Sequence, residues 1–329
     1  MATSPTAGEF ELIARYFAPL ARSQPFAYGL SDDVAWLRPA ADCDLVLTAD
    51  AMVAGVHFLA DDPPDLVARK LLRVNLSDLA AKGARPLGYL MTTAWPRDIA
   101  EDWIAGFAAG LAQDQQEFDV ALLGGDTVAT DGPMHLSLTA VGEVPRGQHL
   151  RRGGGRPGDL VFVSGTIGDG ALGLLAAKGG LRGLAQAERA FLADRYRLPR
   201  PRLALGAAVR QLASAGMDVS DGLVADLGHI CEVSGVSAEL WAGAVPLSPA
   251  AAAAIAREPG LRALTLTGGD DYELVFTIPA DAAAGLAKQG RRLGVAVSQV
   301  GHLASGQGVR VIGADGRPLA LERAGYRHF

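Results

Sequence analysis

Cysteine and long apolar stretches are both scarce in this chain of 329 residues. The two cysteines, Cys43 and Cys231, do not provide a disulfide framework and suit a reducing cytoplasm. The longest uncharged run, residues 240–256, contains two prolines and is too short to predict a membrane span. The N-terminus carries Glu9, Glu11 and Arg15 where a signal peptide would need an apolar core. We therefore expect a soluble cytoplasmic protein that does not bind a membrane.

Basic charge and the common phosphate-binding signature are scarce as well. The formal net charge is −6, and the basic runs are no longer than two residues, which disfavours nucleic acid and anionic membranes as partners. The chain has no Walker loop, because no Gly-Lys-Ser/Thr follows its glycine runs, and it has no Cys/His cluster. Its composition, 49% hydrophobic and 20% charged, is that of a folded protein with a sizeable core.

Aspartate is the residue type that carries the chemistry. Six aspartates lie in separate short motifs, each at or near the end of a predicted strand or helix: Asp33, Asp50, Asp78, Asp126, Asp218 and Asp221. Oxygen ligands dispersed in this way suit a hard cation such as Mg²⁺. Because Mg²⁺ most often accompanies a phosphorylated substrate, the first hypothesis is nucleotide-dependent phosphoryl chemistry.

Strand-like and helix-like patterns alternate along both halves, so the predicted fold class is α/β or α+β. Helices are expected near residues 10–20, 65–82, 103–118, 169–178 and 202–215, and strands near 44–50, 87–93, 120–123, 134–144, 159–164, 217–220, 237–240, 273–278 and 295–300. The segment 151–158, Arg-Arg-Gly-Gly-Gly-Arg-Pro-Gly, interrupts the alternation. We place the domain boundary just before it, which gives domains at residues 1–148 and 149–329.

Two motifs join an aspartate to a predicted strand end. Gly124-Gly125-Asp126-Thr127 follows the predicted strand 120–123, where paired glycines let the backbone approach phosphates and Asp126 can hold a bridging metal. A tight turn with a polar cap explains that motif equally well. In Asp218-Val219-Ser220-Asp221-Gly222, the strand period places Asp218 and Ser220 on one face. Asp221 is also a typical helix N-cap, which is the commoner role for an aspartate there.

Two other motifs have stronger structural explanations. The turn Gly165–Gly170 lies between a strand and a helix but lacks the G-x-G-x-x-G order, so a structural or minor binding role is favoured. Arg152, in the pair Arg151-Arg152, offers guanidinium donors for phosphate, although a solvated linker is the commoner case.

A histidine and an acidic cluster complete the set of candidates. His57, beside Phe58, is more often a packed residue than a ligand when it stands alone. The segment 268–273 concentrates three carboxylates, those of Asp270, Asp271 and Glu273, before a strand. Such a cluster is either solvated or engaged with a cation or cationic substrate, and a functional role is favoured here.

The motifs gain specificity from their order. They are Ser31-Asp32-Asp33, Thr48-Ala49-Asp50, Gly55-Val56-His57-Phe58, Val74-Asn75-Leu76-Ser77-Asp78-Leu79-Ala80, Gly124-Gly125-Asp126-Thr127, Ser220-Asp221-Gly222-Leu223, Gly269-Asp270-Asp271-Tyr272-Glu273-Leu274 and the end Gly325-Tyr326-Arg327-His328-Phe329. From about Gly8 to Phe329 the ordered set resembles the thiamine-monophosphate kinase family, in the superfamily of aminoimidazole ribonucleotide synthetase and selenophosphate synthetase.

The resemblance implies a two-domain fold of the aminoimidazole ribonucleotide synthetase type. Its N-terminal sheet domain would bind ATP and Mg²⁺ and form a homodimer, and its C-terminal α/β domain would complete the nucleotide and substrate site. The implied reaction is the ATP- and Mg²⁺-dependent phosphorylation of thiamine monophosphate to thiamine diphosphate. We therefore expect a thiamine-phosphate kinase with several Mg²⁺ ions and with ATP and thiamine monophosphate as its partners.

The resemblance also implies a role for individual residues. The Mg²⁺ ligands would be Asp33, Asp50, Asp78, Asp126 and Asp218, with Thr48 assisting and Asp221 holding a further ion. Catalysis would depend above all on Asp78, Asp126 and Asp218, ATP would contact Gly125, Asp126, Arg152 and Ser220, and the thiamine phosphate would face His57 and Asp270.

Three positions depart from the family pattern. Ser31 stands where glycine is usual, and Asp270 stands where glutamate is usual, so its acid is one methylene shorter. Arg323 occupies the position of an expected aromatic substrate contact, and Tyr326 is the candidate to supply the ring instead.

The chemistry expected from the residues agrees with a phosphate acceptor. A phosphate monoester has a second pKa of ~6, so its oxygen is largely ionised at neutral pH and requires no general base. Repulsion between unit charges ~4 Å apart is roughly 4 kcal/mol at an effective dielectric of about 20, which several Mg²⁺ ions would offset. The alternatives are another ATP-dependent enzyme of the superfamily, a non-catalytic nucleotide- and Mg²⁺-binding maturation protein, and, from the Gly165–Gly170 turn alone, a nicotinamide oxidoreductase.

Overall fold

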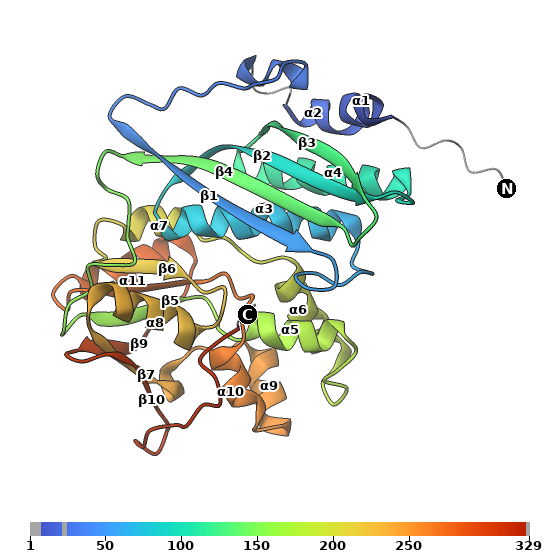
Figure 1. Ribbon diagram of the computed structural model, residues 1–329. Coiled ribbons are helices and arrows are strands. Elements are labelled where there is room, and N and C mark those ends of the chain that lie inside the picture. The colour runs from blue at the N-terminus through green and yellow to red at the C-terminus, as the bar shows by residue number, and fades with distance from the viewer. Residues whose placement is uncertain (1–7, 22–24, 327–329) are drawn as a thin grey trace. The chain divides into compact units, whose positions relative to one another are not determined.

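The computed structural model describes residues 8–21 and 25–326 and divides the chain into two compact units (Figure 1). The N-terminal unit comprises Met1–Leu79 and Arg85–Gly147, and the C-terminal unit comprises Ala80–Ala84 and Gln148–Phe329. The tail residues Arg327, His328 and Phe329 of the last motif lie outside the described residues. None of the described helices is long and apolar enough to cross a membrane.

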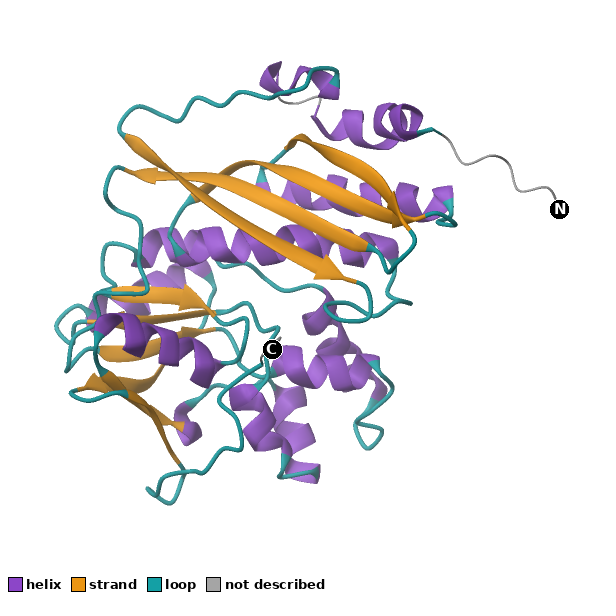
Figure 2. Ribbon diagram, viewed as in Figure 1, coloured by secondary structure: helices purple, strands orange, loops and turns teal. Residues whose placement is uncertain are grey.

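The N-terminal unit is a four-stranded sheet covered on one face by two helices (Figure 2). Its strands are β1 (Cys43–Val53), β2 (Arg85–Pro96), β3 (Leu122–Thr130) and β4 (His135–Pro145), in the order β1-β4-β2-β3. β4 pairs antiparallel with β1 and β2, and β3 pairs parallel with β2. The covering helices are α3 (Pro64–Ala81) and α4 (Glu101–Phe118), which bury Leu72, Leu76, Ile104 and Phe107 completely.

The predicted helix near residues 10–20 is confirmed, with a local irregularity. It consists of α1 (Glu9–Leu12), a π-helical turn η1 (Ile13–Phe17) and α2 (Ala18–Ala21) in direct succession. Leu12, Phe17 and Leu20 are its buried apolar residues. A short 3₁₀ segment η2 (Pro25–Leu30) follows, and both α2 and η2 contact β3.

The C-terminal unit contains a six-stranded mixed sheet. Its strands are β5 (Leu160–Ser164), β6 (Ala215–Asp218), β7 (Ser237–Trp241), β8 (Leu274–Ile278), β9 (Val297–Ala304) and β10 (Gly308–Ile312), in the order β10-β7-β9-β5-β8-β6. Only the β10–β7 pair among these is parallel. The predicted class, helices with mixed sheets in two domains, is therefore confirmed.

Helices pack on both faces of this sheet because successive strand residues point to opposite sides. Val161, Val163 and Val275 join one buried cluster with α8 (Leu223–Ser234). Phe162 and Phe276, whose rings stack 6.2 Å apart, join the other cluster with α7 (Leu203–Val209) and α11 (Ala283–Leu293). The remaining helices are α5 (Asp169–Ala177), α6 (Gln186–Arg197), η3 (Ala242–Ala244), α9 (Pro249–Arg257) and α10 (Leu261–Thr267).

The strand prediction near residues 120–123 was wrong in its position. β3 runs from Leu122 to Thr130, so the glycine pair lies inside the strand and not in a turn after it. The register with β2 shifts at this point and then continues from Met91–Gly125 to Pro96–Thr130. Pairing with β2 thus holds the two glycines in an extended conformation. A glycine pair by itself does not predict this conformation.

Candidate functional site

Three of the predicted metal ligands meet at the contact of β1 with α3. Thr48 and Asp50 project from the half-buried face of β1, as the strand period predicts. The Thr48 hydroxyl donates a hydrogen bond to the Asp78 carboxylate on α3. Asn75, one helical turn before Asp78, accepts from the Asp50 main-chain N–H at 3.1 Å and donates to the Leu71 carbonyl. The helix spacing and the strand spacing thus converge on one group of oxygen atoms.

The charge state of Asp50 reflects this setting. Burial, and next the negative charge of Asp78, raise the pKa of Asp50 from 3.8 to about 6. A divalent cation between the two carboxylates would remove both causes, since it would neutralise the repulsion and replace the lost solvation. The donor set here consists entirely of oxygen atoms and fits a hard ion such as Mg²⁺.

A cavity of about 630 Å³ in the N-terminal unit holds a second group of predicted residues. Asp33, Gly125 and Asp126 line it, together with Thr92 of β2 and Phe10 of the first helix. A Cβ atom at Gly125 would lie 1.8 Å from the Met91 carbonyl oxygen, so glycine is required for the close approach of β3 to β2. The glycine next to Asp126 therefore serves the strand pairing, and Asp126 is carried on a fixed backbone.

The two groups lie on opposite faces of the sheet. Asp126 pairs with Thr92, Thr92 pairs with Ser137, and Ser137 pairs with Ala51, so these residues share one row. Asp50 precedes Ala51 and therefore points to the other face, toward α3. The structure thus does not bring Asp126 together with Asp50 and Asp78 within one chain.

His57 follows β1 and faces its own turn. Its Nδ1 accepts a hydrogen bond from the Val53 main-chain N–H at 3.0 Å, and its carbonyl accepts from the Lys70 ammonium at 3.0 Å. This arrangement leaves Nδ1 unprotonated and the ring half-buried. Whether His57 faces the substrate stays a prediction.

The C-terminal unit brings four predicted residues together around one turn. β6 ends at Asp218, two residues earlier than predicted, and the chain then pairs with the segment before β8. The Asp270 main-chain N–H donates to the Ser220 carbonyl at 2.9 Å. The Tyr326 main-chain N–H donates to the Asp221 carbonyl at 3.0 Å, so the C-terminal segment reaches the same turn.

The acidic residues in the segment before β8 do not all have the same role, and Asp271 serves a structural one. Asp271 is buried and accepts hydrogen bonds from the N–H groups of Gly168 and Gly170, at 2.7 and 2.9 Å. It therefore occupies the N-terminus of α5, where a phosphate could otherwise bind. Burial raises the pKa of Asp271 to about 8, although the two amide donors act to lower it. The Gly165–Gly170 turn thus has a structural role in holding Asp271.

Glu273 is engaged by the protein as well. It is fully buried and accepts from Arg195 at 3.0 Å, from Arg202 at 2.5 and 2.7 Å, and from the Ser164 hydroxyl at 2.6 Å. Two of the three carboxylates in this cluster are thus held by the protein itself, and the functional role expected of Asp270 stays a prediction. Asp270 has a φ of 69°, a left-handed conformation that the anchored residues on either side of it hold in place.

Arg152 and Arg323 lie apart from these groups. Arg152 is exposed, and its carbonyl accepts from Ser234 at the C-terminal end of α8, whereas Ser220 and Asp221 precede the N-terminal end. Arg323 is exposed on the C-terminal segment. The structure therefore does not bring Arg152 and Ser220 together within this unit.

Asp226 has a structural role that sequence patterns did not indicate. The N-cap of α8 is Gly222, not Asp221, and Asp226 accepts from the N–H groups of both residues at 3.1 Å. Burial and the charges of Asp218 and Asp221 raise the pKa of Asp226 to about 8. An aspartate in the first turn of a helix, where a negative charge can accept hydrogen bonds from the free N–H groups, is the signal that could have identified it.

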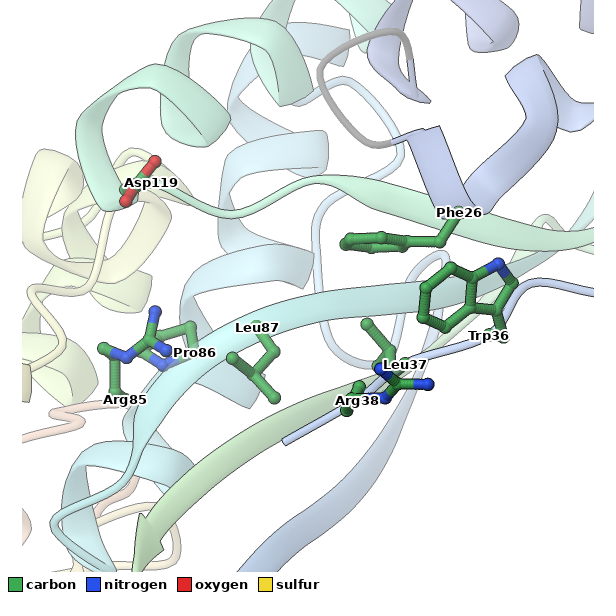
Figure 3. Close-up of a pocket in the computed structure, with 8 residues that line it drawn as sticks. All are labelled: Phe26, Trp36, Leu37, Arg38, Arg85, Pro86, Leu87 and Asp119. Atoms are coloured by element: carbon green, nitrogen blue, oxygen red, sulfur yellow. The ribbon is translucent and has the colours of Figure 1, made fainter. Parts of the chain in front are cut away.

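A second cavity in the N-terminal unit, of about 370 Å³, has a different lining (Figure 3). Phe26 and Trp36 form one side with ring centroids 5.6 Å apart, and the Arg38 guanidinium lies 5.8 Å from the Trp36 ring. Arg85 stands at the other side. The residues that line this cavity include none of the predicted site residues.

Comparisons with known proteins agree with this architecture. Residues 31–144 match the N-terminal domain of AIR synthase related proteins, and residues 156–314 match their C-terminal domain. A thiamine-monophosphate kinase from Caulobacter vibrioides is 46% identical over 97% of this chain and 90% of its own length. The crystal structure of thiamine-monophosphate kinase from Stenotrophomonas maltophilia superposes with a TM-score of 0.83 at 40% identity, covering 93% of this chain and 98% of that one.

A third relative was solved with ligands. AaThiL in complex with AMPPCP and TMP superposes with a TM-score of 0.78 at 29% identity, over 100% of this chain and 99% of that one. Fold and site together define an AIR synthase related protein with two domains. Within that class, the chain belongs to the thiamine-monophosphate kinase family.

Proposed function

We propose that this chain transfers the γ-phosphoryl group of ATP to the phosphate of thiamine monophosphate, forming thiamine diphosphate and ADP. The observation that carries the proposal is identity of 46% over nearly the whole chain with a thiamine-monophosphate kinase. The complex of AaThiL with AMPPCP and TMP supports the same two substrates here. Asp78, which accepts a hydrogen bond from Thr48, and the neighbouring Asp50 add the acidic, oxygen-rich surroundings that phosphoryl transfer needs.

The residues of this chain would act by positioning and charge. Mg²⁺, when bound, neutralises phosphate charge and holds the reacting phosphates close together. Thr48, Asp50 and Asp78 would hold such an ion on the α3 side of the sheet, and Asp33 and Asp126 would hold one at the cavity on the other face. In the C-terminal unit, Asp218 and Asp221 would hold a further ion. No proton needs to be removed from the acceptor, because its phosphate is already ionised.

The contacts to ATP and to the substrate are also proposals. Gly125, Asp126, Ser220 and the exposed Arg152 would contact ATP, although the structure keeps Arg152 and Ser220 at opposite ends of α8.

The proposed substrate contacts lie around the turn at Ser220 and Asp221, which the segment before β8 and the C-terminal segment both contact. The Asp270 main-chain N–H donates a hydrogen bond to the Ser220 carbonyl, and the Tyr326 main-chain N–H donates one to the Asp221 carbonyl. Tyr326 itself is 48% exposed. Together with His57 these residues would face the thiamine phosphate. This placement supports Tyr326 as the aromatic contact in place of Arg323.

We also propose that the chain forms a homodimer through the uncovered face of the N-terminal sheet. That face exposes Leu45, Leu47, Leu90 and Val128, with exposed fractions of 42%, 64%, 43% and 46%. Four large apolar residues gathered on one sheet face are typical of an interaction surface. Because Asp126 lies on the same face, the partner subunit would border the Asp33–Asp126 cavity. The two free cysteines suit the cytoplasm as the place where this dimer works.

One assay tests the reaction. Purified protein is incubated with ATP, Mg²⁺ and thiamine monophosphate, and the products are separated by chromatography. We expect thiamine diphosphate and ADP in equal amounts. ATP binding without turnover would contradict the proposal and favour a nucleotide-binding maturation protein, whereas turnover with a different acceptor would indicate another enzyme of the superfamily.

A further inference from the structure

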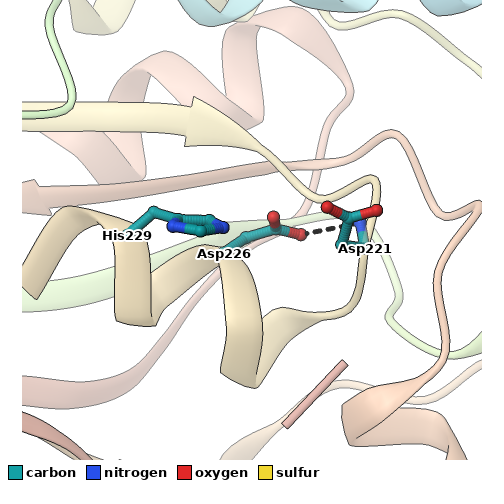
Figure 4. A group of neighbouring side chains, drawn as sticks. All are labelled: Asp221, Asp226 and His229. Atoms are coloured by element: carbon teal, nitrogen blue, oxygen red, sulfur yellow. Dashed lines mark hydrogen bonds between the residues drawn. The ribbon is translucent and has the colours of Figure 1, made fainter. Parts of the chain in front are cut away.

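A cluster of three side chains at the start of α8 offers a mixed set of ligand atoms. Asp221 precedes the helix, and Asp226 and His229 follow on one face of it, three residues apart. One ligand atom from each residue lies within 4.8 Å of the other two. Figure 4 shows the imidazole, the Asp226 carboxylate and the Asp221 side chain in a row, directed toward one another.

Asp226 carries the observation that points to a ligand. The residue is 0% exposed. Its Oδ2 accepts the two main-chain hydrogen bonds at the helix start. Its Oδ1 is buried and has no hydrogen-bond partner among the residues that the structure describes. A buried carboxylate oxygen needs a donor or a cation, because burial without one destabilises the fold.

His229 is placed to supply the third atom. Its side chain is 46% exposed, and its Nδ1 lies 3.9 Å from Glu232 Oε2, a carboxylate that is 80% exposed. Such a surface pair contributes little, so the ring can turn toward Asp226 at low cost. A carboxylate and an imidazole three residues apart on a helix are also the arrangement that many helical metal proteins use.

We propose that Asp221, Asp226 and His229 bind a divalent transition-metal ion of the Zn²⁺ type. An imidazole nitrogen selects such ions, whereas Mg²⁺ prefers oxygen ligands alone, as at Thr48, Asp50 and Asp78. Three protein ligands leave one tetrahedral position open to water. The ion would fasten the turn before α8 to the helix itself. It would also compete with Mg²⁺ for Asp221.

Metal binding tests the proposal without any use of enzyme activity. Metal-free protein is titrated with Zn²⁺ by calorimetry in a buffer that contains excess Mg²⁺. We expect saturable binding of Zn²⁺ to the wild type and an affinity at least about tenfold weaker for His229→Gln. His149→Gln, at an exposed position in the C-terminal unit, is the matched control and should bind as the wild type does. The half-buried Cys43 is present in all three proteins, so its contribution cancels.

A second measurement identifies the ligands. Co²⁺ replaces Zn²⁺ and reports its own coordination through visible absorption, which His229→Gln should abolish or shift. Asp226→Asn keeps a carbonyl oxygen for the two N–H groups while removing the charge, so it should fold and still bind Zn²⁺ weakly. Equal Zn²⁺ affinity in the wild type and His229→Gln, or absence of saturable Zn²⁺ binding, would overturn the proposal.

Discussion

The buried aspartates and glutamates differ in what surrounds their carboxylates. Asp271 accepts two main-chain N–H groups, and Glu273 accepts from two arginines and a serine. Asp50 instead lies near a second carboxylate, and burial, followed by the negative charge of Asp78, raises its pKa. Since a charge buried beside a like charge is unfavourable without a counter-ion, Asp50 is the residue at which metal binding and stability are most directly linked.

The pH dependence of folding reports on Asp50. Its pKa is about 6 in the folded chain against 3.8 ordinarily, so the folded state holds a proton that the unfolded state has already released. This contribution to stability is fully present below pH ~4 and is lost as the pH rises through ~6, by up to about 3 kcal/mol in metal-free protein. Urea unfolding across this range should show the loss in the wild type, and Asp50→Asn should flatten it. Parallel curves for the two proteins would contradict the assignment.

The activity of aspartate-to-asparagine variants distinguishes the proposed metal ligands from aspartates that are merely exposed. We expect Asp78→Asn and Asp126→Asn to lower kcat by a factor on the order of 10² to 10³, because each removes charge that faces the phosphates. Circular dichroism should show both variants folded. Asp131→Asn, at an exposed position just after β3, is the control and should retain full activity. Near-normal turnover by either ligand variant would remove that aspartate from the site.

The elements of this fold differ in how visibly the sequence marks them. α3, α4 and β4 were predicted closely because each repeats its apolar residues at one period over a long stretch. α9 was missed although Ser248 caps it and Pro249 begins it, since it is only nine residues long and its apolar residues are nearly all alanines. β10 is a short strand at the edge of the sheet, where alternation has too few residues to be recognised.

Contacts within the site were predictable only between residues that lie close together along the chain, or where several motifs in order resemble those of one family. Thr48 with Asp50 follows from the strand period, and Asn75 with Asp78 follows from the helix period. The partners of Glu273 lie 71, 78 and 109 residues away, so no local pattern could indicate them. The separation of Asp50 from Asp126 depends on strand register, which is likewise a property of the folded sheet.

The element that presents Asp270 depends on the buried ion pairs at the start of β8. Glu273→Gln preserves side-chain volume but removes the negative charge that faces Arg202 and leaves Arg195 with only the more distant carboxylate of Asp169, at 3.8 Å. We expect it to lower the free energy of unfolding by about 3–5 kcal/mol, measured by chemical denaturation. Glu239→Gln is the control, because Glu239 pairs with the exposed Arg310 and its loss should cost less than about 1 kcal/mol. Similar losses for the two variants would show that the buried network does not hold the segment.

At the scale of the whole molecule, the uncovered face of the N-terminal sheet is the surface through which we propose that two chains form a dimer. Leu47 is 64% exposed at the centre of β1, and a charge there would be desolvated by a partner subunit. We expect Leu47→Glu to shift the mass measured by light scattering from that of a dimer toward the 34.1 kDa of one chain.

The control for that experiment is an exposed leucine away from the sheet face. Leu319, 39% exposed in the C-terminal unit, provides it, and Leu319→Glu should remain dimeric. If the dimer borders the cavity that contains Asp33 and Asp126, Leu47→Glu should also raise the KM for ATP as the protein is diluted, while Leu319→Glu should not. A wild-type chain that is monomeric at micromolar concentration, or a Leu47→Glu variant that stays dimeric, would show that this face is not where two copies meet.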